Sequence, residues 1–391
     1  MTTTKKLELA ERFRSFPAYP LADVPQIKRE LAARGVDVID LGAGDADLAP
    51  PPAAVEALIR AARDPAMGRY PFQLGLPAFR EAVADWMERR FGVRLDAYKE
   101  ILPIIGSKEG IAHLALCYVG PGDRTILPDP GYQPYVGGTL LAGGEPYAVP
   151  LRPENRFLIP LDEIPAEVVG RARILYLNYP NNPTAAIAPR EYLEEAVAFC
   201  RRHGIVLVYD NAYSEIAFDG YRPPSIFEID GARDVAVEFH SFSKTYNMTG
   251  WRLGWAAGSA EIIAALSRVK SFIDTGAFMA VQAAGKAALE SWDEWVPGNV
   301  AAFRERRDAA VDALREQGFD ATSPAATMYL WVPTPGGVAS EPFARRALLE
   351  QGVVIMPGAA LGAGGEGFFR IALTQPPDRL REAARRLGAL L

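Results

Sequence analysis

The sequence predicts an α/β protein with a mostly parallel central sheet flanked by helices and a smaller α+β domain. Between residues 101 and 258, short apolar runs alternate with helical patterns, as expected for parallel strands that helices connect. The length of 391 residues is typical of about two domains. From residue 299 onward, long helical patterns surround three short apolar runs, which predicts a second, smaller unit.

The N-terminal part begins with a polar arm and a short helix over residues 1–34. A strand is expected at 36–41, and it leads into Gly42-Ala43-Gly44-Asp45. Two glycines here can bring backbone N–H groups close to a ligand carboxylate, although a plain tight turn explains them equally well. Helices at 53–63 and from Phe79 enclose the loop 68–75, which is rich in aromatic residues and glycine.

Two strands follow, each with a candidate binding residue at its end. The run 101–105 leads into Gly106, Ser107 and Lys108, which open a helix whose free N–H groups can bind a phosphate. That signal is weak alone, because many helices begin this way. The strand 125–127 ends in a proline- and glycine-rich turn that carries Tyr132, an aromatic that either lies on a planar ligand or packs in the core.

A strand–helix–strand unit comes next, with strands at 173–177 and 205–209 and a helix that ends at His203. Asn182 follows the first strand, and Asp210 and Tyr213 follow the second. Ligands of such sheets bind at the carboxyl ends of the strands. We therefore expect these side chains at one rim of the sheet.

The stretch 240–254 carries the most informative residues. An apolar run ends at Phe239, and Ser241, Ser243, Lys244 and Arg252 follow it closely. A lysine amine can form a Schiff base with an aldehyde, while hydroxyls and a guanidinium can hold a phosphate. Taken alone, the lysine and serines are more typical of a surface loop with a solvated lysine.

In the C-terminal part, strands are expected at 253–258, 328–332, 353–356 and 368–373. Helices are expected within 260–290 and at 299–317, 341–350 and 377–390. Arg370 lies among apolar residues of the last strand, so it either binds an anion or points to solvent. The pattern of residues 362–367 matches G-x-G-x-x-G, but it precedes a strand and opens no helix, so a dinucleotide site is rejected.

Composition excludes several classes of protein. The net charge of −6 argues against nucleic acid or an anionic membrane as a partner. No secretory signal and no run of about 18 apolar residues is present, and the two cysteines, Cys117 and Cys200, are expected to be buried thiols of a cytoplasmic protein. The three histidines lack metal-ligand spacing, so no metal site is expected.

In order along the chain, these motifs resemble the class I/II aminotransferases, which are pyridoxal 5'-phosphate enzymes of fold type I. The motifs that carry the resemblance are Pro130-Gly131-Tyr132, Asn181-Asn182-Pro183-Thr184, Asp210-Asn211-Ala212-Tyr213, Ser241-Phe242-Ser243-Lys244 with Gly250 and Arg252, and Phe369-Arg370. The resemblance covers nearly the whole chain. It implies a large cofactor-binding domain over 50–290 and a small domain formed by 1–49 with 291–391.

The resemblance also implies roles for individual residues. Lys244 carries the cofactor and shuttles the substrate proton, Asp210 pairs with the pyridinium nitrogen, and Tyr132 stacks on the ring. The ring oxygen is bound by Asn182 and Tyr213, and the phosphate by Ser107, Lys108, Ser241, Ser243 and Arg252. Tyr70 reaches the phosphate of the neighbouring subunit in a homodimer. The substrate α-carboxylate is held by Arg370, the Gly44 backbone and Asn182.

Within the family, the sequence is most similar to the LL-diaminopimelate aminotransferases of lysine biosynthesis. The matching stretches are 16–19, 37–42, 105–113 and 177–184, and in that group Tyr19 and Lys108 help to bind the substrate. The sequence departs from the group at Ala46 and Ala185, and residues 68–76 contain no acid for the distal ammonium, only Gln73. Three alternatives therefore stay open: a broad-specificity glutamate, alanine or aromatic aminotransferase, a pyridoxal-phosphate β-lyase, and a non-catalytic ligand-binding protein.

Overall fold

The computed structural model describes residues 7–16, 23–72 and 74–391. Seven strands form the central sheet: β2 Ile101–Ile104, β3 Arg124–Asp129, β4 Glu145–Pro150, β5 Ala172–Leu177, β6 Val206–Asp210, β7 Ala236–Ser241 and β8 Gly254–Gly258. Their order is β2-β8-β7-β6-β5-β3-β4. Strands β3 to β7 pair in parallel, whereas β8 is antiparallel to both of its neighbours. The predicted mostly parallel sheet is confirmed.

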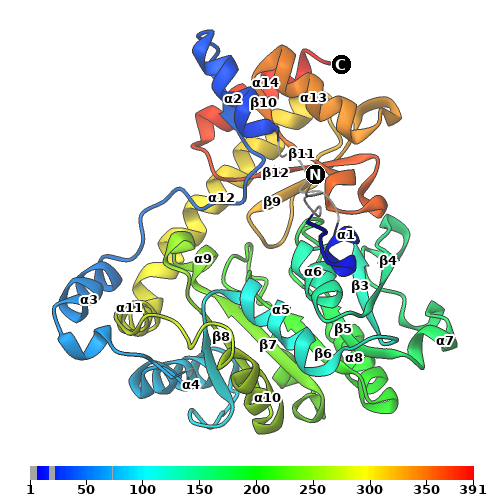
Figure 1. The fold of residues 1–391 in the computed structure, drawn as a ribbon. Coiled ribbons are helices and arrows are strands. Elements are labelled where there is room, and N and C mark those ends of the chain that lie inside the picture. Colours follow the sequence, from blue (N-terminus) through cyan, green and yellow to red (C-terminus); the bar gives the residue numbers. More distant parts are fainter. Residues whose placement is uncertain (1–6, 17–22, 73) are drawn as a thin grey trace, which may run out of the picture.

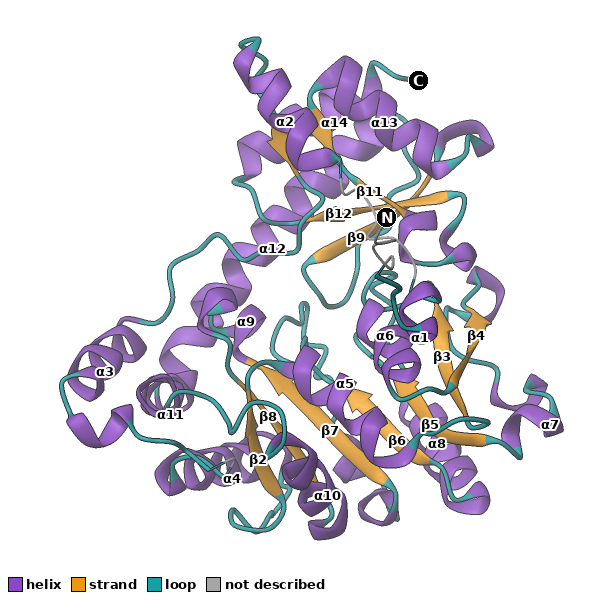
Figure 2. Cartoon of the chain, in the orientation of Figure 1, coloured by secondary structure: helices purple, strands orange, loops and turns teal. Residues whose placement is uncertain are grey.

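Helices cover both faces of this sheet (Figure 2). The helices of this part are α3 Pro52–Ala62, α4 Pro77–Phe91, α5 Ser107–Tyr118, α6 Gln133–Leu141, α7 Ala166–Val169, α8 Arg190–His203, α9 Phe242–Thr245, α10 Ala260–Lys270 and α11 Met279–Glu290. Alternate residues of β5 face opposite cores: Ile174 and Tyr176 pack with α5 and α10, Leu175 and Leu177 with α8. Burial on both faces explains why the strands are apolar almost throughout.

The two ends of the chain build the upper part of Figure 1. Strand β1 Ile39–Asp40 pairs in parallel with β10 Val353–Val354. A second small sheet contains β11 Met356–Pro357, β12 Phe368–Ala372 and β9 Tyr329–Pro333, in that order. The helices here are α2 Val24–Ala33, α13 Ser340–Gln351 and α14 Pro377–Gly388, whereas α1 Glu11–Arg14 lies lower, at the level of α6 in Figure 1. Helix α12, Trp292–Glu316, runs from the lower part to the upper one (Figure 1).

The domain boundaries at residues 50 and 290 stay a prediction. Three features differ from the sequence expectations. Strand β4 and helix α6 were not expected, and the helix expected at 299–317 begins already at Trp292; the helices expected within 260–290 are α10 and α11. Helix α12 continues through Pro297, which cannot donate a backbone hydrogen bond. Trp292 and Trp295 pack against the apolar cluster formed by α4 and α11, and this packing offsets the lost bond. None of the described helices combines the length and apolar character that a membrane crossing requires.

Candidate active site

A cavity of about 710 Å³ opens where the carboxyl ends of the parallel strands face the upper part of the molecule. Most of the predicted site residues line it: Gly44, Ser107, Lys108, Tyr132, Asn182, Asp210, Tyr213, Ser241, Ser243, Lys244, Arg252 and Arg370. Tyr70 lies elsewhere, with 72% of its surface exposed, and Tyr19 is outside the described residues. The topology therefore gathers side chains that are far apart in the sequence into one site.

Lys244 reaches the cavity from the short helix α9, which begins directly after β7. Ser241 caps this helix, because its hydroxyl accepts a hydrogen bond of 3.2 Å from the Ser243 backbone. The Lys244 Nζ donates to the carbonyl oxygen of Gly44, which lies on the segment between β1 and α3. The amine thus stands between the large sheet and the N-terminal segment, at the centre of the cavity.

The anion-binding end of the cavity is built on the N-terminus of α5. Gly106 precedes this helix with φ 94°, and a Cβ on it would come within 2.4 Å of the Arg252 Nη2. Only glycine therefore lets the guanidinium lie against the turn. Arg252 also donates to the Thr249 carbonyl at 2.9 Å. Free helix N–H groups, a guanidinium and the hydroxyls of Ser107 and Ser243 form a donor set that suits a phosphate.

Asp210 ends strand β6 and is 3% exposed. One carboxylate oxygen, Oδ2, accepts a 2.8 Å hydrogen bond from the Tyr135 hydroxyl, whereas Oδ1 is buried without a partner among the described residues. Burial raises the pKa of this carboxyl to about 6. An unpaired buried acceptor of this kind suits the N–H⁺ of a pyridinium ring, so the site passes this test for pyridoxal phosphate.

Arg370 enters the cavity from β12 and is 5% exposed. Its Nη1 donates to Asn182 Oδ1 at 2.7 Å and its Nη2 to the Gly42 carbonyl at 2.8 Å. Its Nε has no partner, and no carboxylate among the described residues forms an ion pair with it. A buried guanidinium without an anion is costly, so the position is suited to a carboxylate of a ligand. The alternative that Arg370 points to solvent is wrong.

Two tyrosines of the site were missed in the sequence. Tyr135, in α6, lies in the same turn as Tyr132, so a signal existed: a second aromatic directly after that strand end. Tyr329, the first residue of β9, lies under Arg370 and receives a hydrogen bond of 3.3 Å from the Tyr213 hydroxyl. Its position on a C-terminal strand gave no signal, because the contact depends on how the two parts of the chain pack.

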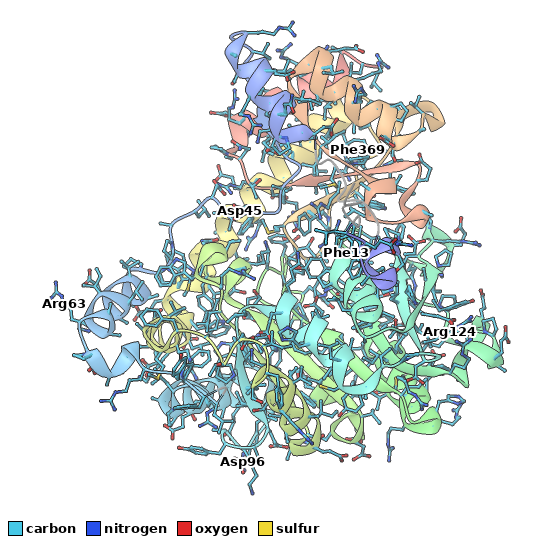
Figure 3. All side chains as sticks on the ribbon, in the orientation of Figure 1. Phe13, Asp45, Arg63, Asp96, Arg124 and Phe369 are labelled. Carbon is cyan, nitrogen blue, oxygen red and sulfur yellow. The ribbon has the colours of Figure 1, made fainter. Side chains whose placement is uncertain are left out.

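Two acidic residues also line the cavity. Asp40 is paired with Lys28 at 2.5 Å and accepts the Gly42 N–H at 2.9 Å. Asp45 follows Gly44, and its carboxylate is exposed and has no partner within the described part of the chain. Figure 3 shows Asp45 on the segment that joins the upper and lower parts.

Comparison with known proteins agrees with this geometry. The sequence matches the family "Aminotransferase class I and II" over residues 36–387. It is 52% identical to an LL-diaminopimelate aminotransferase of Desulforudis audaxviator, covering 98% of this chain and 97% of the relative. The corresponding enzyme of Moorella thermoacetica is 49% identical, covering 98% and 99%.

A solved structure, a probable N-succinyldiaminopimelate aminotransferase from Thermus thermophilus, superimposes with a TM-score of 0.89 at 42% identity. The match covers 94% of this chain and 99% of that structure. Sequence, fold and the residues around Lys244 lead to one conclusion. The chain belongs to the class I and II aminotransferases and is a pyridoxal-phosphate-dependent transaminase that acts on amino and oxo acids.

Proposed function

We propose that this transaminase moves an amino group from LL-diaminopimelate to 2-oxoglutarate. The observation that carries the proposal is the set of relatives with this name, which are 45–52% identical over nearly their whole length. The resemblance of residues 16–19, 105–113 and 177–184 to the same group supports it. The pathway that this implies is lysine biosynthesis.

We assign the cofactor to the cavity around Lys244. Pyridoxal phosphate, when bound, supplies an electron sink that acidifies the α-hydrogen of the amino acid. Lys244 would hold the cofactor covalently, and its free amine would move the substrate proton, for which its contact with the Gly44 carbonyl gives a fixed position. Asp210 would accept the pyridinium N–H⁺ at its unpaired Oδ1, while Tyr135 holds its other oxygen.

The remaining predicted residues hold the rest of the cofactor and the substrate. Asn182 and Tyr213 would bind the ring oxygen, and Tyr132 would stack on the ring. The phosphate would be held by Ser107, Lys108, Ser241, Ser243 and Arg252. Arg370 would bind the α-carboxylate, with Asn182 and the Gly44 backbone beside it. Tyr19 lies outside the described residues and keeps the substrate-binding role that the resemblance implies.

The charges in the cavity suit a substrate with two amino-acid ends. One carboxylate of diaminopimelate pairs with Arg370. Lys108 is an exposed cation of the cavity with no partner in the described ranges, and it is available for the second carboxylate. Asp45 is an exposed acid of the same cavity with no partner among the described residues. We assign the distal ammonium to Asp45 because residues 68–76 contain no acid and Gln73 lies outside the described residues.

We further propose a cytoplasmic homodimer with shared sites. Tyr70 and Phe72 are 72% and 67% exposed, and Phe272 and Phe278 are 85% and 50% exposed. Phe278 lies directly before α11, and the segment after Tyr70 and Phe72 reaches this helix through the Leu76 N–H, which donates to Gln282 Oε1 at 2.8 Å. Large apolar side chains concentrated in this way favour burial against a second copy, which would bring Tyr70 to the partner's phosphate.

One second substrate has specific support. The Thermus thermophilus structure, 42% identical, is named a probable N-succinyldiaminopimelate aminotransferase. An acylated distal nitrogen carries no charge and needs no carboxylate, which agrees with the acid-free loop 68–76. The experiment must therefore distinguish a substrate with a free distal amino group from one in which that group is acylated.

The test mixes the cofactor-loaded protein with LL-diaminopimelate, N-succinyl-LL-diaminopimelate, glutamate or phenylalanine and follows the visible cofactor absorption. Rapid loss of that absorption with LL-diaminopimelate, restored by 2-oxoglutarate, is the expected result. If only the succinylated or only the other amino acids react, the proposed substrate is wrong.

Asp45→Asn provides a finer measurement. Because Asp45 is exposed, loss of one ion pair there is worth about 1 kcal/mol, so KM for LL-diaminopimelate is expected to rise about fivefold. The KM for glutamate, which has no distal ammonium, serves as the control and is expected to stay unchanged. Equal effects on both amino acids would contradict the assignment of Asp45.

A further inference from the structure

Tyr329 is a buried aromatic residue of the cavity wall that has no role in the function described so far. It is 3% exposed, and its ring lies beneath Arg370, with the guanidinium carbon 4.2 Å from the ring centroid. A desolvated guanidinium over an aromatic face is among the stronger cation–π arrangements. The ring therefore covers one face of the Arg370 guanidinium, whereas Asn182 and the Gly42 carbonyl accept from its edge.

The Tyr329 hydroxyl touches a different part of the site. It accepts a hydrogen bond of 3.3 Å from the Tyr213 hydroxyl. It also abuts Gly44, since a Cβ built on that glycine would lie 2.0 Å from the phenolic oxygen. The Gly44 carbonyl in turn accepts from Lys244 Nζ. One side chain thus contacts elements that carry the substrate-binding arginine, the cofactor-binding tyrosine and the segment beside the reactive amine.

We propose that Tyr329 is a positioning residue with two separable parts: its ring orients Arg370 for the substrate carboxylate, and its hydroxyl orients the Tyr213 hydroxyl. The inference rests on the roles proposed above for Arg370 and Tyr213. Only glycine at position 44 leaves room for the Tyr329 hydroxyl in this place, because any Cβ there would collide with it.

The acidities of the two phenols agree with this division. Burial raises the pKa of Tyr329, but the cations of Lys244 and Arg370 and the Tyr213 hydrogen bond outweigh it, so that the pKa is lowered overall. Burial, followed by the neighbouring Tyr329, raises the pKa of Tyr213 well above its ordinary value. When Tyr213 turns its proton toward a ligand, the more acidic Tyr329 is the natural donor to the Tyr213 oxygen.

Two variants separate the two parts. Tyr329→Phe keeps the ring and removes the hydroxyl, whereas Tyr329→Leu removes both. With the holoenzyme, the dissociation constant of glutarate, a dicarboxylate without an amino group, is measured through the cofactor absorption. In Tyr329→Leu it is expected to rise about tenfold, while Tyr329→Phe is expected to stay within about twofold of wild type.

The second readout is the pH midpoint of the cofactor absorption in the resting enzyme. Loss of one hydrogen bond to Tyr213 is expected to shift it by about half a pH unit in Tyr329→Phe. A merely structural role would leave the midpoint unchanged in Tyr329→Phe and glutarate binding unchanged in folded Tyr329→Leu, and would lower stability alone.

Arg370→Gln distinguishes failure of this inference from failure of the proposed roles. If Arg370→Gln binds glutarate as wild type does, the assignment of Arg370 is wrong and the inference falls with it. If Arg370→Gln loses glutarate but Tyr329→Leu, folded by circular dichroism, keeps it within about twofold, the ring has no positioning role. An unchanged midpoint in Tyr329→Phe removes the role of the hydroxyl.

Discussion

Replacing Asp210 by asparagine is expected to make the cofactor-free protein more stable while weakening its hold on the cofactor. The carboxyl is 3% exposed, and only Oδ2 has a hydrogen-bond partner among the described residues. Asparagine fills nearly the same volume, and its carbonyl oxygen can still accept from the Tyr135 hydroxyl. The change therefore removes a buried charge and leaves the packing in place.

The magnitude follows from the pKa of Asp210. Burial raises it from the ordinary 3.8 to about 6 in the cofactor-free protein. Because the folded-state pKa is the higher one, the favourable contribution is complete below about pH 4 and is lost as the pH rises through about 6. About two pKa units at 1.36 kcal/mol each correspond to roughly 3 kcal/mol of lost stability at pH 7.5, as an order of magnitude.

Urea unfolding of cofactor-free wild type and Asp210→Asn at pH 7.5 and pH 4.5 measures this contribution. The variant is expected to be more stable by about 2–3 kcal/mol at pH 7.5, and the difference is expected to shrink toward pH 4.5. Cofactor affinity, measured by absorption, is expected to fall in the variant because the pyridinium loses its counter-charge. A variant less stable than wild type at pH 7.5 would refute the reasoning that Asp210 is destabilised by burial.

Three further predictions concern the phosphate end, the reactive amine and a buried ion-pair network. Gly106→Ala is expected to weaken cofactor binding at least tenfold, because its Cβ would displace Arg252. Gly122→Ala is the matched control, since Gly122 has φ 91° and a Cβ there would have no neighbour within 4 Å. Equal cofactor affinities of the two variants would contradict the close approach of Arg252 to Gly106. Lys244→Ala is expected to abolish turnover but to keep the fold, as followed by circular dichroism, and an active variant would contradict its assignment. Lys270→Met is expected to lower the free energy of unfolding by about 3 kcal/mol, because Lys270 is fully buried between Glu109 at 2.8 Å and Asp274 at 2.9 Å. As a control, Lys286→Met breaks the exposed pair with Glu290 and is expected to lower the free energy of unfolding by less than about 0.5 kcal/mol. An equally small loss in Lys270→Met would show that the buried ion pairs of Lys270 do not stabilise the fold.

The Lys270 network also bears on the prediction that the protein has no metal site. Glu109, His113 and Asp274 offer ligand atoms that lie within 4.8 Å of one another. The Lys270 ammonium contacts two of these three residues, so a cation of the protein itself already lies in this cluster. The spacing of the three histidines in the sequence gave no hint of this arrangement, because its members come from α5, α10 and the loop after α10.

The sequence by itself determined the fold class, the reaction class and the positions that surround Lys244. These depend on local patterns: apolar strands buried on both faces, such as β5, and short motifs that directly follow a strand, such as those at Asp210 and Lys244. Each motif lies at a strand's carboxyl end, so parallel pairing alone brings them to one rim.

Only the tertiary structure decided which partners complete these residues. Tyr135 meets Asp210 across 75 residues, and Tyr213 meets Tyr329 across 116 residues. Arg370 was recognised as a residue that either binds an anion or faces solvent, and packing of β12 against Gly42 and Asn182 decided for burial. Such contacts have no local signature, because they arise where the C-terminal strands meet the large sheet, and their geometry depends on the packing of the entire chain.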